Sequence, residues 1–131
     1  MEMEDRRKIC RLVAGIIVSD DHVAEAEASF LKRIYVRFRL PEEEVAEVQP
    51  IDAGAASNAL RQLPDHVRAK VVALLVEAAI ADGIIHPQER AYLLVAAAAL
   101  GIEGDVMEQR IAARLERFSE QGPMSDPGAY D

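Results

Sequence analysis

The sequence ADGIIHPQE at residues 81–89 separates two strongly apolar runs, and its features predict how the chain folds. An aspartate closes the first apolar run, an aliphatic residue follows three positions later, and a glutamate stands seven positions after the aspartate. The sequence SDDHVAEAE at residues 19–27 has the same arrangement. A motif that recurs at a fixed offset predicts one helical hairpin used twice, over about residues 8–40 and 70–102. The paired acidic residues are Asp20 with Asp82 and Glu27 with Glu89, at an offset of 82 − 20 = 62.

Apolar residues on both sides of the two motifs recur at steps of three and four, which is the period of an amphipathic helix. Prolines and capping residues mark the starts of further helices between and after the hairpins. No run alternates with period two, so the chain is predicted to be all-α. The expected helices lie at about residues 4–19, 41–48, 53–62, 64–81, 87–100 and 105–118, with a further helix that has Glu27 in its first turn and its apolar pattern at residues 30–38.

The second hairpin is apolar on nearly every side. Between Val71 and Ala81 only Glu77 is polar, and no charged residue stands in residues 91–100. A helix without a polar face must be enclosed by other helices. We therefore expect this hairpin at the centre of the fold, with the more amphipathic first hairpin packed outside it.

Length and charge limit the classes of function. The 131 residues, half of them apolar, are enough for one compact domain, expected at residues 1–118 and followed by a disordered acidic tail at residues 119–131. A formal charge of −8 disfavours nucleic acid and anionic membranes as partners. Cys10 is the only cysteine and is expected to be buried, and no apolar run is long enough to span a bilayer. A cytoplasmic protein without membrane insertion is expected.

The four paired acidic residues are the candidate metal ligands. Glu27 and Glu89 stand in first helical turns, where a carboxylate faces the positive end of the helix dipole. Asp20 and Asp82 stand where helices end, so either loop amides or a cation must compensate their charge. The sequence around Asp82 matches only the second half of an EF-hand loop, so one hairpin alone lacks enough oxygen ligands for calcium. A shared site for calcium, magnesium, manganese or zinc requires both loops to meet; otherwise the four residues have a purely structural role.

Other residues suggest weaker alternatives. His86 and His22 do not obey the repeat, and capping or surface roles are expected for both. Four basic residues near the end of the first hairpin either complement a helix dipole or form a docking patch for a protein partner. They are Lys32, Arg33, Arg37 and Arg39. No nucleophile with a partnered base is visible, so an enzyme built on the four carboxylates is the third hypothesis.

The chain resembles the tellurite-resistance TerB family through its repeated Ala-x-x-Asp-Gly-x-Ile-x-x-x-Glu pattern. The resemblance is best at residues 80–89 and covers roughly Lys8 to Leu115. This superfamily also includes the N-terminal region of DjlA-type co-chaperones. The resemblance implies a compact bundle of about seven helices, no catalytic chemistry, and a role in stress-response or envelope-associated assemblies. It also implies divalent-metal binding through Asp20 with Glu27 and Asp82 with Glu89. In the first copy Asp21 replaces the motif glycine, and no J-domain is present.

Together these observations predict a non-enzymatic TerB-like binding module, monomeric or homodimeric, that holds a divalent cation weakly at Asp20, Glu27, Asp82 and Glu89. The alternative is a protein-interaction adaptor that binds its partner without metal.

Overall fold

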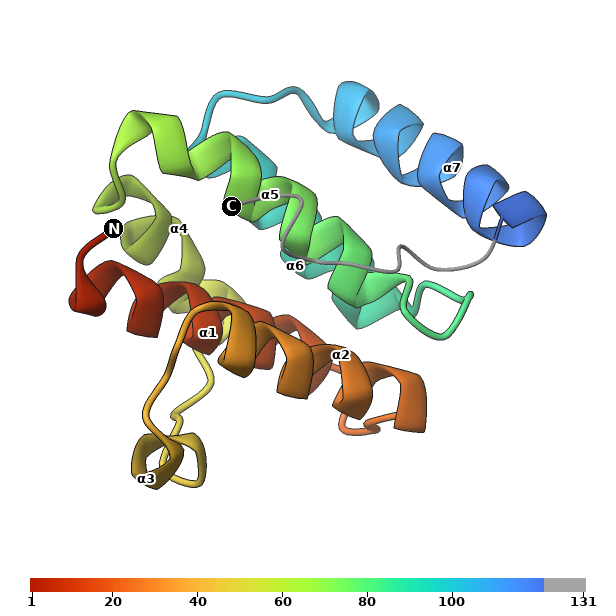
Figure 1. The fold of residues 1–131 in the computed structure, drawn as a ribbon. Helices are drawn as coiled ribbons and strands as arrows, with labels where there is room; N and C mark the ends of the chain where they lie inside the picture. Colours follow the sequence, from red (N-terminus) through yellow and green to blue (C-terminus); the bar gives the residue numbers. More distant parts are fainter. Residues whose placement is uncertain (122–131) are drawn as a thin grey trace.

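The computed structural model describes residues 1–121, which form seven helices and no strand (Figure 1). The all-α prediction is confirmed. Sequence signals for helix starts are used as expected: the Asp52 side chain accepts a hydrogen bond from the Ala55 amide at 2.9 Å, and Pro64 directly precedes a helix. The helices are α1 Met3–Ile17, α2 Glu25–Arg37, α3 Glu42–Val45, α4 Ala53–Arg61, α5 Asp65–Ala79, α6 Pro87–Ala99 and α7 Gly104–Gln121.

The centre of the bundle differs from the sequence prediction. Helix α5 is buried on most sides as expected, but α1 packs along it and is also buried from Ile9 to Ile17 except at Arg11. Helix α6, in contrast, leaves Ala91 and Ala98 exposed. The expectation that the first hairpin packs wholly outside the second is therefore wrong for α1. The reason is that the apolar residues of α1 occupy a wide face of this helix. Helix α2 is the outer helix of the first hairpin, and its Val36 is 78% exposed.

A close contact joins α1, α6 and the segment before α4. The Tyr92 hydroxyl donates a hydrogen bond of 2.6 Å to the Ile51 carbonyl oxygen in the core. Gly15 lies against the same carbonyl: a Cβ atom there would lie 1.9 Å from the Ile51 oxygen. Only glycine allows this approach. Gly15 stands little more than one helical turn before Asp20, and Tyr92 stands about one turn after Glu89. The contact of both residues with the Ile51 carbonyl therefore fixes the two motifs relative to each other.

Both interhelical loops lie at the same end of the bundle, at the right in Figure 1, because α1 and α5 run side by side toward it. The C-terminal part of α7 reaches that end as well, and Phe118 contacts Gly83 in the second loop. Farther back on α7, Arg114 donates to the buried Glu77 carboxylate, with Nη2 and Oε1 2.7 Å apart. These contacts hold α7 over the second hairpin.

Two expectations concern the chain beyond its core. Helix α7 continues to Gln121, three residues into the segment predicted as an acidic tail, and the rest of that segment, residues 122–131, lies outside the described residues. Within the described part of the chain, none of the helices is both long enough and apolar enough to cross a membrane.

Candidate metal centre

The two loops begin with the same turn. The Asp20 side chain accepts a hydrogen bond from the His22 amide at 3.0 Å, and the Asp82 side chain accepts one from the Ile84 amide at 3.1 Å. In each loop the residue after the aspartate has a positive φ, 61° at Asp21 and 84° at Gly83. Loop amides therefore satisfy one carboxylate oxygen of each aspartate, as the sequence suggested.

The two glutamates also have equivalent positions. Each is the third residue of its helix, and its Oε1 accepts the amide of the residue that precedes the helix: Ala24 donates to Glu27 at 2.9 Å, and His86 donates to Glu89 at 3.1 Å. This is one half of a capping box. Both glutamates are fully buried. The cap uses one oxygen of each carboxylate, and the other, Oε2, has no hydrogen-bond partner.

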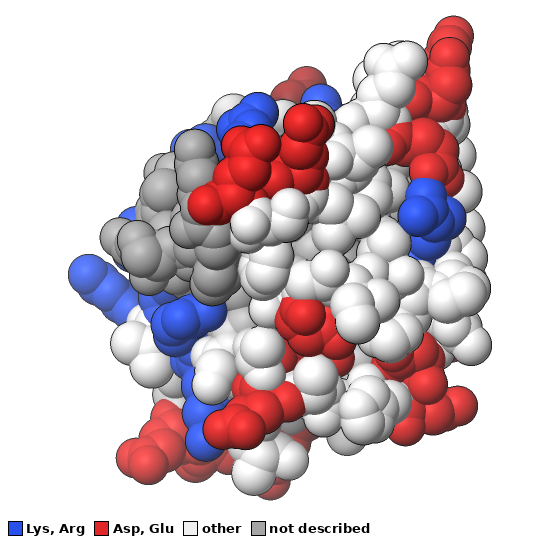
Figure 2. Space-filling view, turned by 90° about the vertical axis from the view of Figure 1, so that its right-hand side faces the viewer, with Lys and Arg blue, Asp and Glu red and all other residues white. Residues whose placement is uncertain are grey.

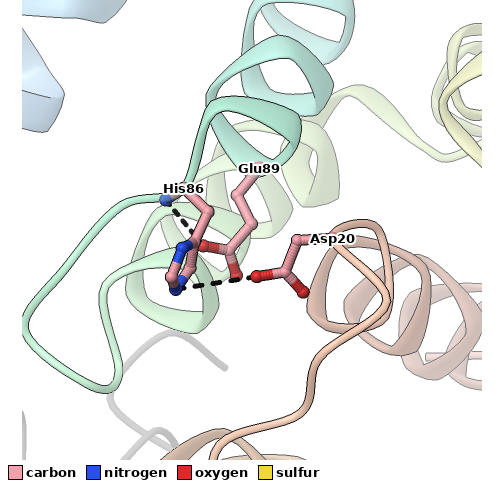
Figure 3. A group of neighbouring side chains, drawn as sticks. All are labelled: Asp20, His86 and Glu89. Carbon is pink, nitrogen blue, oxygen red and sulfur yellow. Dashed lines mark hydrogen bonds and ion pairs between the residues drawn. The ribbon is translucent and has the colours of Figure 1, made fainter.

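The loops converge on His86. Its Nε2 atom lies 3.6 Å from Oδ2 of Asp20, across the two hairpins, and 3.5 Å from Oδ2 of Asp82. Asp20, His86 and Glu89 each place one ligand atom within 4.8 Å of the others (Figure 3). Glu27 completes the group, because it interacts with the Glu89 carboxyl. The four acidic residues predicted from the sequence therefore lie in one place, around a histidine.

This concentration of carboxylates alters the chemistry of Glu89. Burial, followed by the neighbouring carboxylates of Glu27 and Asp20, raises the pKa of Glu89 to about 9, and the hydrogen bond from the His86 amide opposes the shift. In the absence of a cation, Glu89 therefore holds a proton at neutral pH. A divalent cation can take the place of that proton, since its charge would compensate several carboxylates at once.

The donor set fits a metal ion. Ligands on opposite sides of a bound divalent ion are separated by up to about 4–5 Å, twice the metal–ligand distance, so the ligand atoms of Asp20, His86 and Glu89 are near enough to share one ion. Three buried atoms of the group lack hydrogen-bond partners: Oε2 of Glu27, Oε2 of Glu89 and Nε2 of His86. Without an ion, the proton on Glu89 joins it to Glu27 and leaves Nε2 of His86 unpartnered, whereas one bound ion would serve all three atoms.

Access to the group is limited to one side. The side chain of His86 is 30% exposed and that of Asp82 is 18% exposed, whereas the Asp20 side chain is 6% exposed and both glutamates are buried. The end of the molecule that carries both loops is drawn in Figure 2, where acidic side chains lie among uncharged ones. A cation would reach the buried carboxylates past His86 and Asp82.

His86 is the residue that sequence reasoning missed. It occupies the predicted capping position before α6, but its side chain makes no capping hydrogen bond and turns toward the carboxylates instead. Its spacing held the signal: His86 stands four residues after Asp82 and three before Glu89, so all three approach one another across a single loop. His22 is exposed, in agreement with its predicted surface role.

The arginines for which the sequence allows either a helix-dipole role or a docking patch do not line one pocket. Arg37 and Arg39 line a pocket at the end of α2, whereas Arg33 lies over the Phe30 ring, 5.9 Å from its centroid, and lines a different pocket. Cys10 is buried as predicted, and burial raises the pKa of its thiol to about 12. A thiol in this state is unreactive at neutral pH.

Comparison with known proteins supports the resemblance seen in the sequence. A family model described as tellurite resistance protein TerB matches residues 46–115, which is more than half of the 131-residue chain. The matched region contains Asp82, His86 and Glu89, while Asp20 and Glu27 precede it. No curated protein and no solved structure matches the chain.

Proposed function

Because the chain belongs to the tellurite-resistance TerB family, we propose that it is a non-enzymatic helical binding module that holds one divalent metal ion between its two interhelical loops. The observation that carries the proposal is the group of unpartnered buried atoms from Glu27, Glu89 and His86, which lie where both loops meet. Asp20, His86 and Glu89 would hold the ion directly. Glu27 and Asp82 lie beside these three residues. They would add negative charge near the ion, or coordinate it in place of one of the three.

The ion would act on the fold as much as on the site. Asp20 belongs to the loop after α1, and Glu89 belongs to the first turn of α6, so an ion bound to both would join the two hairpins. It would also compensate carboxylates that otherwise repel one another. Metal binding to the folded state alone stabilises that state by mass action. We therefore propose that metal occupancy sets the rigidity of this end of the bundle.

The ligand types favour particular ions. Calcium and magnesium prefer oxygen ligands, whereas imidazole nitrogen suits zinc and other transition metals, and manganese accepts carboxylates readily. A group with one histidine and several carboxylates should therefore bind zinc or manganese more tightly than calcium or magnesium.

A non-enzymatic role is favoured by the burial of the glutamates. The raised pKa of Glu89 would suit a general acid, which is the property that an enzyme built on these carboxylates requires. A general acid must also come within hydrogen-bond reach of its substrate. Glu89 and Glu27 are both fully buried, so a substrate could not approach their carboxyl groups in this conformation. We propose instead that the module serves a stress response such as tellurite resistance, in keeping with the family name, and that it does so through a protein partner.

Calorimetric titration with zinc, manganese, calcium and magnesium chlorides tests the metal site. The parent protein should bind one equivalent of zinc or manganese, and Glu89→Gln should bind at least about 100-fold more weakly, since it lacks the anionic ligand. The amide oxygen of glutamine keeps the capping hydrogen bond, so the variant should fold. Glu25→Gln is the matched control: it removes the same charge from an exposed first-turn position of α2 and should bind metal as the parent does.

The proposal fails on either of two results. One is the absence of binding for all four ions in the parent protein. The other is equal affinity in the parent and Glu89→Gln, which would place the bound ion elsewhere on the acidic surface.

A further inference from the structure

We propose that a pocket lined by arginines, between the start of α1 and the end of α2, binds a phosphate group. The pocket has a volume of about 290 Å³ and lies in a protein whose formal charge is −8. It is separate from the metal centre and independent of the function proposed for it. The lining residues are Met1, Arg6, Arg37, Phe38 and Arg39.

The pocket concentrates positive charge from two helices. Arg6 belongs to the second turn of α1, Arg37 is the last residue of α2, and Arg39 follows that helix. The described lining residues include no aspartate or glutamate. The guanidinium groups of Arg6 and Arg39 line the same pocket, so an anion that binds between them is stabilised by both.

Helix dipoles explain only part of this arrangement. Arg37 and Arg39 stand at the C-terminal end of α2, where positive charge is favourable. Arg6 stands near the N-terminal end of α1, where the dipole disfavours positive charge. Its Nε atom is also buried and has no hydrogen-bond acceptor. A buried donor of this kind costs free energy unless a ligand supplies the acceptor.

The backbone fixes Arg39 in place. Its φ is +55°, the left-handed conformation that ends many helices and that glycine usually occupies, as Gly101 does after α6 with a φ of +76°. The Leu40 amide donates to the Tyr35 carbonyl oxygen at 3.0 Å, and the Arg39 amide donates to that of Val36 at 3.1 Å. These bonds hold the backbone at the end of α2 in one geometry, so the Cα atom of Arg39 stays at the edge of the pocket.

Phosphate fits the pocket better than a carboxylate does. Each guanidinium offers paired N–H donors that match two oxygens, and a phosphate dianion has enough oxygens to serve more than one arginine. The volume equals that of about ten water molecules, which leaves room for one phosphate group and part of the molecule that carries it. A polyanion such as nucleic acid would meet the acidic surface around the pocket. The ligand expected here is a single phosphate monoester.

Binding is tested by calorimetry and NMR at low ionic strength, with a chelator present so that the metal centre does not contribute. The probes are phenyl phosphate, inorganic phosphate, a phosphoserine peptide and acetate. The parent protein should bind the phosphate probes and should bind acetate at least tenfold more weakly. Tighter binding of the peptide would identify a protein-borne phosphate as the source, and equal affinity for inorganic phosphate would identify a free one.

Two variants locate the site. Arg6→Gln and Arg39→Gly should each weaken phenyl phosphate binding at least tenfold. Arg39→Gly removes the guanidinium and relieves the positive φ, so this variant folds at least as well as the parent. Arg33→Gln is the matched control, because it removes the same charge from α2 at a residue that lines another pocket. Absence of phosphate binding, equal weakening in the control, or acetate binding as tight as phosphate binding would overturn the proposal.

Discussion

The two interhelical loops have the same turn and the same carboxylates but contribute differently to the site. In each, an aspartate accepts an amide hydrogen bond two residues ahead and a buried glutamate accepts one three residues behind. The residue before the second helix is Ala24 in the first loop and His86 in the second. Only the second loop therefore has an imidazole at the position before its helix, and this imidazole reaches across to Asp20 of the first loop.

This difference teaches that a repeated motif need not produce two equivalent sites. A calcium loop of the EF-hand type provides most ligands from one continuous segment. Here each loop alone provides too few, and the two together form one mixed group of carboxylates and a histidine. The single histidine makes the group asymmetric, and changes made in one loop should have different effects from the same changes made in the other.

The largest expected difference concerns the two histidines. His86→Ala should weaken binding of zinc or manganese by at least about 10- to 100-fold, because removal of a residue that only supports a metal ligand already costs that much. His22→Ala should leave the affinity unchanged, since His22 is exposed in the first loop. Calorimetric titration of both variants against the parent measures this difference. Equal loss in the two variants would show that the histidines act through general surface charge and not through a site at His86.

The next effect is on stability and pH. The pKa of Glu89 is raised to about 9 from an ordinary value of 4.5, so the folded state holds a proton that the unfolded state releases. The stability that this proton contributes is present below about pH 4.5 and is lost as the pH rises through about 9. Glu89→Gln removes this dependence. Without metal at pH 8, the variant should be more stable than the parent by on the order of 2 kcal/mol, because the folded parent must take up a proton that Glu89 of the unfolded chain does not hold at that pH.

Urea denaturation at pH 5 and pH 8, with a chelator present, measures the difference. The difference in free energy of unfolding between variant and parent should be small at pH 5 and larger at pH 8. Added zinc should stabilise the parent alone. A variant less stable than the parent at pH 8 would contradict the repulsion between Glu89 and its neighbours. Glu25→Gln again serves as the control, because Glu25 is exposed.

Much of this arrangement could be predicted from the sequence, and the exceptions have physical causes. Helical periodicity and the capping signals at Asp52 and Pro64 act within a few residues, so they predicted the helices closely. The meeting of Asp20 with Glu89 depends on how α1 packs against α5 and α6, which no local pattern contains. The role of His86 was missed for a related reason, since its interaction with Asp20 joins residues that are distant in the chain. The extension of the repeat over residues 8–40 and 70–102 stays a prediction.

The turns of the two loops provide a third comparison. Gly83→Ala should destabilise the protein by about 1–2 kcal/mol, because a side chain at positive φ is strained. The new Cβ would also lie 3.0 Å from the Phe118 ring, so this ring would have to move by a few tenths of an ångström. Asp21→Gly makes the opposite change in the first loop and should be neutral or stabilising, since Asp21 already has a φ of 61°. Thermal unfolding of both variants tests the pair, and equal destabilisation would show that the loops do not share a turn.

The smallest effect separates the two helix starts. Ala24 precedes α2 and provides no side-chain cap, whereas Asp52 caps α4 through its carboxylate. Ala24→Ser should stabilise the protein by about 0.5–1 kcal/mol, because the serine hydroxyl can accept an amide hydrogen bond in the first turn of α2. His86→Ser in the second loop offers the same cap but removes the imidazole. Without metal this variant should gain similar stability, and its affinity for zinc should be lower than that of the parent. Denaturation with and without zinc distinguishes these outcomes, and a His86→Ser variant that kept its full zinc affinity would show that the imidazole is not a ligand.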